Sequence, residues 1–169
     1  MLDFFRLMVP VTLMHRGPDR VPYSQSLFVL ALLLCTGITL LAAMLAERPI
    51  GLTIVSFVAA ATLYGASILF LLVLYGFRNR ALQTLTAAFG ASAVFGLVDI
   101  GIVLVAGMGA NAALVDTAAL ALLLWALLID GFIISSALGI GLSLGCLLAF
   151  SILLPQVALV TAIGGAAAG

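Results

Sequence analysis

Long runs of apolar residues separated by short polar breaks fill most of this chain. The runs are continuous and do not alternate between apolar and polar positions, which favours helices over strands. Polar or turn-forming breaks lie at Glu47-Arg48-Pro49, at Arg78-Asn79-Arg80 and at Gly107 to Asn111. A helix needs about 20 apolar residues to cross a bilayer core of about 30 Å. The pattern therefore predicts a series of bilayer-spanning helices.

The run from Ala112 to Ile163 is too long for one span, because about 50 helical residues would measure roughly 75 Å. It must fold back once, and Asp130-Gly131 and the stretch from Ser135 to Gly139 are its turn-compatible points. We place the reversal between residues 130 and 139. The predicted fold is an all-α polytopic membrane bundle with spans at about 26–46, 52–77, 83–107, 112–132 and 137–160.

The first 25 residues hold much of the polar material and are predicted to form an interfacial arm. Met1 to Met14 reads as a short helix with a bend near Pro10, lying flat at the membrane surface. Charged residues at 16, 19 and 20 interrupt any signal-peptide core, so none is expected. The helix bundle covers 26–163, and 164–169 is predicted to be a flexible tail. The arm offers a cytoplasmic contact surface of Arg16, Pro18, Arg20, Pro22 and Tyr23.

Composition supports a membrane protein and excludes one class of partner. Of 169 residues, 66% are hydrophobic and 7% are charged, whereas soluble domains carry roughly a quarter charged residues. The formal net charge is zero, so no basic field for nucleic acid exists and no nucleic-acid partner is expected. The expected partners are membrane lipids and either other membrane subunits or a second copy of the chain.

The arginines predict an orientation. With the N-terminus inside, the cytoplasmic side holds the arginines at 6, 16, 20, 78 and 80, and the outer side holds only Arg48. Five spans then put the C-terminus in the periplasm, whereas a re-entrant last segment would return it inside. The lysine-free, Ala- and Leu-rich composition is typical of GC-rich bacterial genomes, so the expected location is a bacterial inner membrane.

Three acids are candidate intramembrane polar sites. An acid at a helix centre costs about 2.5–3.5 kcal/mol on insertion scales, so it should face the bundle interior. Asp99 is predicted near the midplane, either with a structural hydrogen bond or with a role in proton, ion or ligand handling. Asp116 is predicted near the outer helix end, and Asp130 near the inner end, at a turn or within reach of Arg78 or Arg80.

The sequence offers no catalytic, metal-binding or cofactor motif. His15 is the single histidine, so this chain cannot form a histidine cluster for metal or haem. Cys35 and Cys146 are isolated within apolar runs and are expected to be reduced. The serines of the spans have no histidine partner, so nucleophilic catalysis is not expected. Trp125 and Tyr64 lie inside spans and are interpreted as packing residues.

Small residues recur at every fourth position in two predicted spans and form the strongest local pattern. Such ridges let helix backbones approach closely in lipid. They serve either packing within the monomer or association with another chain. The two predicted ridges are Ala137, Gly141, Gly145 and Ala149 in the last span, and Ala88, Ser92 and Gly96 in the third.

Several short motifs resemble those of small bacterial inner-membrane proteins related to the Yip-type five-span superfamily. They are Arg16-Gly17-Pro18, Pro22-Tyr23-Ser24 and the stretch from Gln83 to Ala87. The resemblance covers nearly the whole chain, including the segment from Gly131 to Leu138. In that segment the group has a polar stretch with histidines and arginine, where this chain has Phe132 and two serines. The resemblance implies five spans and no known enzymatic chemistry.

Two functions follow from these features. The leading hypothesis is a non-catalytic membrane scaffold, assembly factor or accessory subunit that acts through helix–helix and lipid contacts. The alternative is a small transporter or pore that uses Asp99 within the membrane, and an intramembrane enzyme ranks third. A dry, closed core would favour the scaffold, and a cavity that reaches Asp99 would favour transport.

Overall fold

The computed structural model describes residues 2–14 and 22–166, and within these residues every regular element is helical. Five helices are long and apolar enough to cross a membrane, which confirms the predicted all-α bundle. A short helix and a 3-10 turn accompany them. The elements are α1 (Leu2–Thr12), α2 (Gln25–Leu45), α3 (Ile50–Leu74), η2 (Arg78–Arg80), α4 (Ala81–Gly107), α5 (Ala112–Leu138) and α6 (Leu142–Ala166).

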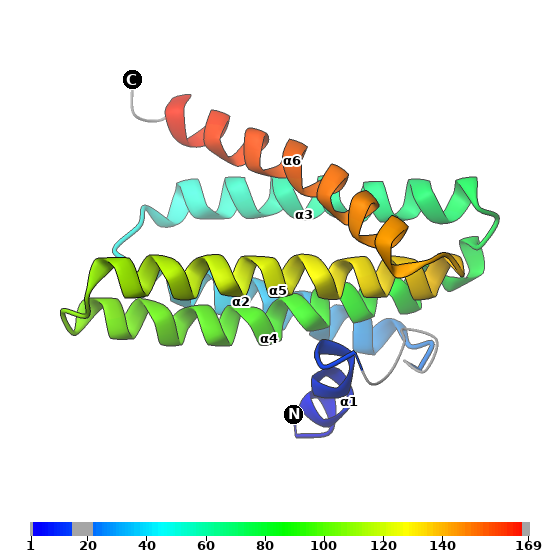
Figure 1. Ribbon diagram of the computed structural model, residues 1–169, viewed down its shortest axis with the longest axis horizontal. Coiled ribbons are helices and arrows are strands. Elements are labelled where there is room, and N and C mark those ends of the chain that lie inside the picture. Colours follow the sequence, from blue (N-terminus) through cyan, green and yellow to red (C-terminus); the bar gives the residue numbers. More distant parts are fainter. Residues whose placement is uncertain (1, 15–21, 167–169) are drawn as a thin grey trace.

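The five long helices run up and down along one axis and pack in two layers (Figure 1). Helices α2, α4 and α5 form one layer, and α3 and α6 form the other. The turns after α2 and α4 lie at one end of the bundle, which we call the Glu47 end. The turns after α3 and α5 lie at the opposite end, which we call the Arg78 end. Helix α3 packs more on α6 than on α2, its neighbour in sequence.

Helix ends follow from local sequence signals. Ser24 caps α2, because its hydroxyl accepts a hydrogen bond from the Leu27 amide at 3.3 Å. Asn111 caps α5 in the same way, through the Ala113 amide at 2.9 Å. Helix α5 ends at Gly139, whose φ of 68° is left-handed and favours glycine.

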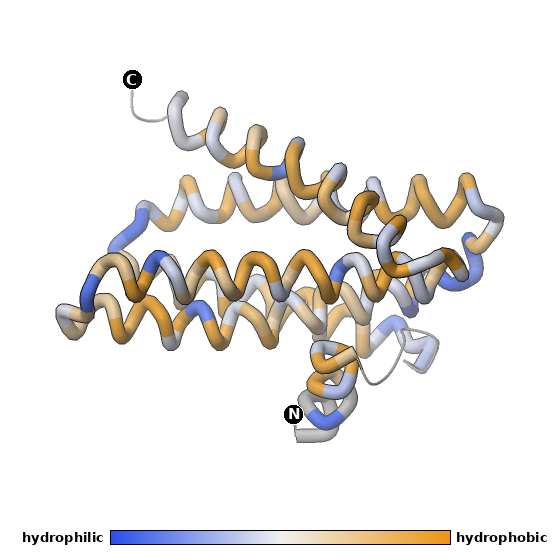
Figure 2. Tube along the Cα trace, viewed as in Figure 1, coloured by the Kyte–Doolittle hydropathy of each residue, from blue (hydrophilic) through white to orange (hydrophobic). Residues whose placement is uncertain are grey.

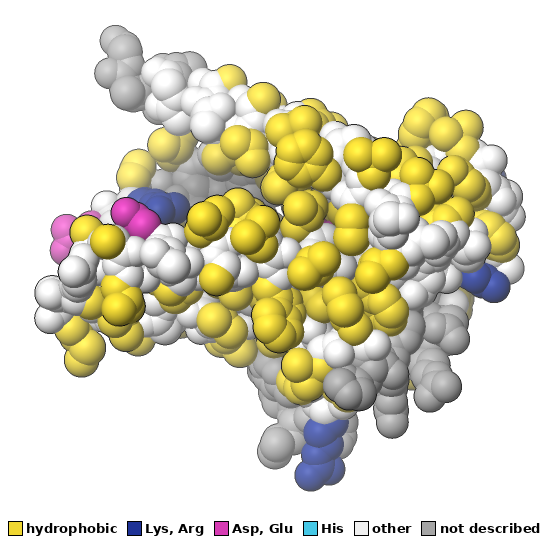
Figure 3. All heavy atoms as spheres, viewed as in Figure 1, with side chains coloured by type: hydrophobic (Ala, Val, Ile, Leu, Met, Phe, Trp, Pro, Cys, Tyr) yellow, Lys and Arg dark blue, Asp and Glu magenta, His cyan; other side chains and the backbone are white. Residues whose placement is uncertain are grey.

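The outward faces of the bundle are apolar along most of their length (Figures 2 and 3). Large hydrophobic side chains such as Leu33, Phe70 and Leu147 are more than 60% exposed. Patches of this extent are rare on soluble monomers and suit a hydrocarbon environment. Hydrophilic positions gather mainly at the ends of the bundle, and a few interrupt the apolar helices, as the blue segments in Figure 2 show.

The interior is built from small side chains on α4. Ala87, Ala88, Ala91 and Ala93 have no exposed surface, and α2 and α5 pack against this helix. At Gly96 an added Cβ atom would lie 2.7 Å from the Ile38 side chain of α2. The predicted ridge of Ala88, Ser92 and Gly96 therefore serves packing within the monomer.

The second predicted ridge is divided between two helices. Ala137 belongs to α5, Gly141 lies in the turn, and only Gly145 and Ala149 belong to α6. The predicted reversal between 130 and 139 is too early, because α5 continues to Leu138 and the turn is made at 139–141. The tail also begins later than predicted, since α6 extends to Ala166.

Helices α5 and α6 cross at very close range. A Cβ atom added at Gly131 would lie 2.5 Å from Cys146 Sγ and 2.8 Å from Cys146 Cα. A Cβ atom added at Gly145 would collide with the carbonyl oxygen of Gly131 and lie 2.7 Å from Ser135 Cβ. Glycine at both positions is therefore a condition of this crossing.

Helix α1 forms as predicted and packs against the bundle. Met8 is fully buried and contacts α4 at Gly90, where an added Cβ atom would collide with its sulfur. The indole N–H of Trp125 donates a hydrogen bond to the Thr12 carbonyl oxygen at 3.2 Å. Of the predicted contact residues of the arm, Pro22 and Tyr23 are exposed, and Arg16, Pro18 and Arg20 lie outside the described residues.

The two glycines that the sequence pattern treated alike should differ in their tolerance of a methyl group. Gly145→Ala should lower stability by about 1–3 kcal/mol, because the methyl group overlaps the α5 backbone. Gly141→Ala is the matched control, since a Cβ atom added at Gly141 would lie 4.0 Å from Ser143 Oγ, which is an ordinary contact distance. Thermal unfolding of the two purified variants in detergent measures their stabilities. An equal loss of stability in both variants would contradict this account of the crossing.

Candidate functional site

Asp130 lies within α5, where its carboxylate oxygen Oδ1 accepts a hydrogen bond from the Tyr64 hydroxyl of α3 at 2.7 Å. The residue stands eight positions before the helix end at Leu138, or about 12 Å along the axis. The expectation of a turn or terminal residue is therefore wrong. Arg80 does not reach the acid either, because its guanidinium donates to the Ala137 carbonyl oxygen at 3.3 Å and lies 4.9 Å from the Phe77 ring centre.

A cavity of about 260 Å³ lies beside Asp130, between all five long helices. We call it the chamber. Its polar lining consists of Cys35 and Thr39 of α2, Tyr64 of α3, Ser92 of α4, Asp130 of α5 and Gln156 of α6. One water molecule needs about 10–15 Å³ of such space. The chamber is therefore large enough for several waters or for a small organic solute.

The chamber is an open cleft about midway along the bundle, well away from both ends. Tyr64 is ten positions from the end of α3 at Leu74, and Cys35 is ten positions from the start of α2 at Gln25. Each distance is about 15 Å along the helix axis. Since the hydrocarbon core is about 30 Å thick, this places the polar groups near its middle.

Most of the polar groups that line the chamber offer hydrogen-bond acceptors, and the Gln156 carboxamide adds both an acceptor and N–H donors. The Thr39 hydroxyl donates to the Cys35 carbonyl oxygen at 2.8 Å, and the Ser92 hydroxyl donates to the Ala88 carbonyl oxygen at 3.0 Å. The Tyr64 hydroxyl donates to Asp130. Each hydroxyl has one hydrogen, so only its oxygen lone pairs remain for a ligand. With the second carboxylate oxygen of Asp130, these groups favour a bound cation.

No positive side chain lines the chamber, and the described residues 2–14 and 22–166 hold no cluster of three potential metal ligands. A buried carboxylate without a counter-charge is expensive in a low-dielectric environment. A cation in the chamber would therefore stabilise the charged form of Asp130 beyond its hydrogen bond from Tyr64, and the neutral form holds a transferable proton.

The close crossing of α5 and α6 positions this acid. Gly131 follows Asp130 directly and contacts α6 near Cys146, so α6 approaches α5 one residue from the carboxylate. Gln156 of α6, which directly follows Pro155, joins Asp130 in the lining of the chamber. On the opposite side, the Tyr64 ring packs edge-on against Phe89 of α4, with ring centres 6.0 Å apart.

The other two candidate acids face away from the interior. Asp99 and Asp116 are both exposed on the outside of the bundle. The prediction that Asp99 faces the interior is wrong, because the neighbouring α4 positions Gly96 and Ile100 take that face, against α2 and the buried core. Nothing in the sequence groups Thr39, Tyr64 and Gln156 with Asp130, because these residues lie on four helices that only the packing of the bundle brings together.

No protein-family model, curated protein or solved structure matches this chain.

The Tyr64–Asp130 hydrogen bond should contribute measurably to stability. Tyr64→Phe keeps the ring but leaves the carboxylate without its donor, so the free energy of unfolding should fall by about 1–2 kcal/mol. Tyr75→Phe is the matched control, because Tyr75 lies at the end of α3 and is 45% exposed. Chemical unfolding in mixed micelles compares the two, and a Tyr64→Phe variant as stable as the parent would contradict the role of this contact.

Proposed function

We propose that this chain is a small membrane carrier that binds a cationic solute at Asp130. The chamber supports this proposal through one combination of features. It holds a carboxylate near the middle of the bundle, several acceptor oxygens and no positive side chain. An ionisable residue inside a membrane bundle often marks a substrate or ion pathway. The proposed role involves no covalent chemistry, so we propose no enzymatic activity.

The arrangement of α6 supports movement of a solute to and from the chamber. The half of α6 near the C-terminus diverges from α5 toward the Glu47 end, as Figures 1 and 3 show. Gln156 lies on this diverging helix, one residue after Pro155. A proline inside a helix removes a backbone hydrogen bond and weakens the helix locally. Displacement of this half of α6 would widen the chamber toward the Glu47 end.

Asp99 supports a second candidate, an accessory subunit or scaffold. Its exposed carboxylate lies eight residues before the end of α4, about 12 Å along the axis, and the described part of the chain gives it no hydrogen bond or ion pair. Contact with a cation or donor of another chain would remove its cost in lipid. By contrast, the small-residue ridge of α4 is used within the monomer.

The same proposal includes a location. A bacterial inner membrane, with the N-terminus and the Arg78 end in the cytoplasm and the C-terminus in the periplasm, agrees with the arginine distribution. Membership of the Yip-type five-span group is part of this proposal and rests on the motifs of the arm and of α4.

Cation flux in proteoliposomes tests the carrier. The vesicles contain the purified chain, and uptake of protons, Na⁺, K⁺ and tetramethylammonium is measured in turn. At least one of these cations should enter faster than into empty vesicles, and Asp130→Asn should reduce that rate at least tenfold. Asn keeps an acceptor for Tyr64 but removes the charge.

Matched controls are Asp99→Asn and Asp116→Asn, because both acids are exposed outside the chamber. Both variants should transport at the parent rate. Absence of flux for all four cations, or equal loss in the three variants, would overturn the carrier proposal.

Self-association tests the second candidate. If Asp99 docks on another copy of the chain, Asp99→Leu should shift the oligomer to monomer in native mass spectrometry from a mild detergent. Asp116→Leu, which also removes an exposed acid, should leave the oligomer intact. A parent chain that is monomeric in detergent and in nanodiscs would contradict docking between copies.

A further inference from the structure

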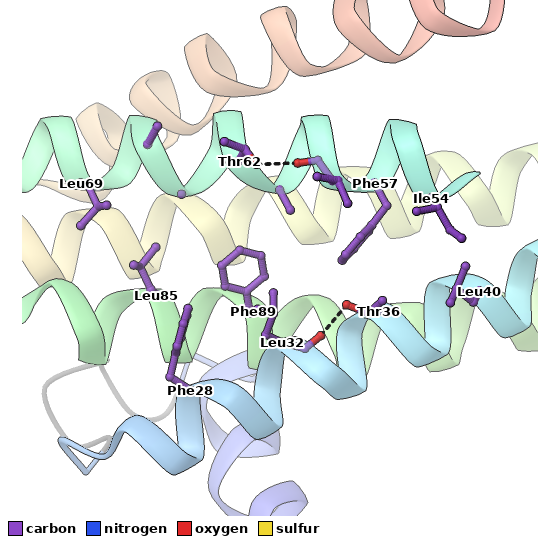
Figure 4. A pocket seen from close by; sticks show the side chains of 14 residues that line it. Phe28, Leu32, Thr36, Leu40, Ile54, Phe57, Thr62, Leu69, Leu85 and Phe89 are labelled. Carbon is purple, nitrogen blue, oxygen red and sulfur yellow. Dashed lines mark hydrogen bonds between the residues drawn. The ribbon is translucent and has the colours of Figure 1, made fainter. Parts of the chain in front are cut away.

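An apolar groove of about 520 Å³ lies between α2 and α3, next to the chamber. Figure 4 shows Leu32 and Leu40 on the α2 side and Ile54 and Leu69 on the α3 side, with Leu85 of α4 between them. The groove exists because α2 packs mainly on α4 and α3 packs mainly on α6. The two helices are consecutive in the chain but do not close against each other.

The groove offers no free hydrogen-bond donor. Its two polar side chains are Thr36 and Thr62, and their hydroxyls donate to carbonyl oxygens of their own helices. These bonds, drawn as dashed lines in Figure 4, measure 2.8 Å to Leu32 and 2.7 Å to Val58. The groove therefore fits a hydrocarbon chain and would exclude a polar one.

The groove and the chamber adjoin each other. Phe57, Ala61 and Phe89 line both spaces. The Phe89 ring stands at their boundary, with edge-on contacts to Phe28 at 6.1 Å on the groove side and to Tyr64 at 6.0 Å on the chamber side. A ligand can thus place an apolar chain and a polar head in adjacent spaces.

The chamber side of this boundary combines aromatic rings with a carboxylate. Phe57, Tyr64 and Phe89 line the chamber together with Asp130. Aromatic faces attract cations, and groups of such rings are the common way in which proteins recognise alkylated ammonium. The acceptor oxygens of Thr39 and Ser92 add negative potential without donating a hydrogen bond.

We infer that the ligand is a single-chain amphiphile with an alkylated ammonium head, which lies in the chamber at Asp130 while its alkyl chain occupies the α2–α3 groove. This inference rests on the proposed function and names its substrate class. The groove faces outward between two helices, so the amphiphile reaches the chamber sideways from the bilayer.

Equilibrium binding to the full chain in dodecyl maltoside micelles tests this inference with two probes. Tetramethylammonium carries the head alone, and dodecyltrimethylammonium carries the head with a chain. After subtraction of binding to empty micelles, the dodecyl probe should bind at least tenfold more tightly. Asp130→Asn should weaken both probes at least tenfold, and helix content by circular dichroism confirms that the variant is folded.

Ala66→Phe separates the groove from the chamber. Ala66 is exposed and lines the groove but not the chamber, so a phenyl ring there should block the alkyl chain. The variant should lose at least tenfold in affinity for the dodecyl probe and bind tetramethylammonium like the parent. Ala119→Phe is the control, since Ala119 is exposed on α5 and lines neither space.

The outcomes distinguish the two proposals. Suppose that tetramethylammonium binding depends on Asp130. If the dodecyl chain then adds no affinity, or if Ala66→Phe does not weaken binding of the dodecyl probe, the groove inference is wrong and the carrier proposal stands. If neither probe depends on Asp130, both proposals fail. Dodecylphosphocholine identifies the source of the ligand: binding equal to that of the dodecyl probe assigns it to a zwitterionic lipid, and weaker binding assigns it to a cationic amphiphile.

Discussion

The placement of a carboxylic acid inside an apolar bundle is the constraint on which the rest of this structure depends. Asp130 has the Tyr64 hydroxyl at 2.7 Å and no positive side chain among the residues that line the chamber. An acid in such a position needs a donor, a proton or a cation. The hydrogen bond links α3 to α5 across the two layers, and the chamber lies beside this link.

Glycine and alanine make this arrangement possible. Gly131 and Gly145 let α5 and α6 cross with backbones in contact, and the buried alanines of α4 let α2 and α5 approach it. Helix α2 packs mainly on α4 and α3 packs mainly on α6, so a groove opens between α2 and α3. The same small residues thus account for both the rigid part of the bundle and its unfilled space.

The sequence was sufficient for the fold but not for the site. Continuous apolar runs and short polar breaks give five helices, because bilayer thickness fixes the length of a span. The sequence does not reveal the late turn, because Asp130-Gly131 is typical of a turn although Gly131 serves a helix crossing and Gly139 ends the helix. Predicted depth in the membrane is the only feature of the sequence that favours Asp99 over Asp130. Which side of a helix faces inward depends on packing partners, and the uniformly apolar faces of α4 and α5 contain no such signal.

Infrared difference spectroscopy of the Asp130 carboxyl group tests most directly the claim that this acid meets a cation inside the bundle. Spectra of the chain in lipid are recorded before and after addition of dodecyltrimethylammonium. The account predicts a change in the carboxyl bands that disappears in Asp130→Asn and persists in Asp99→Asn. A spectrum that does not change on addition of the cation, or a change that persists in Asp130→Asn, would contradict it.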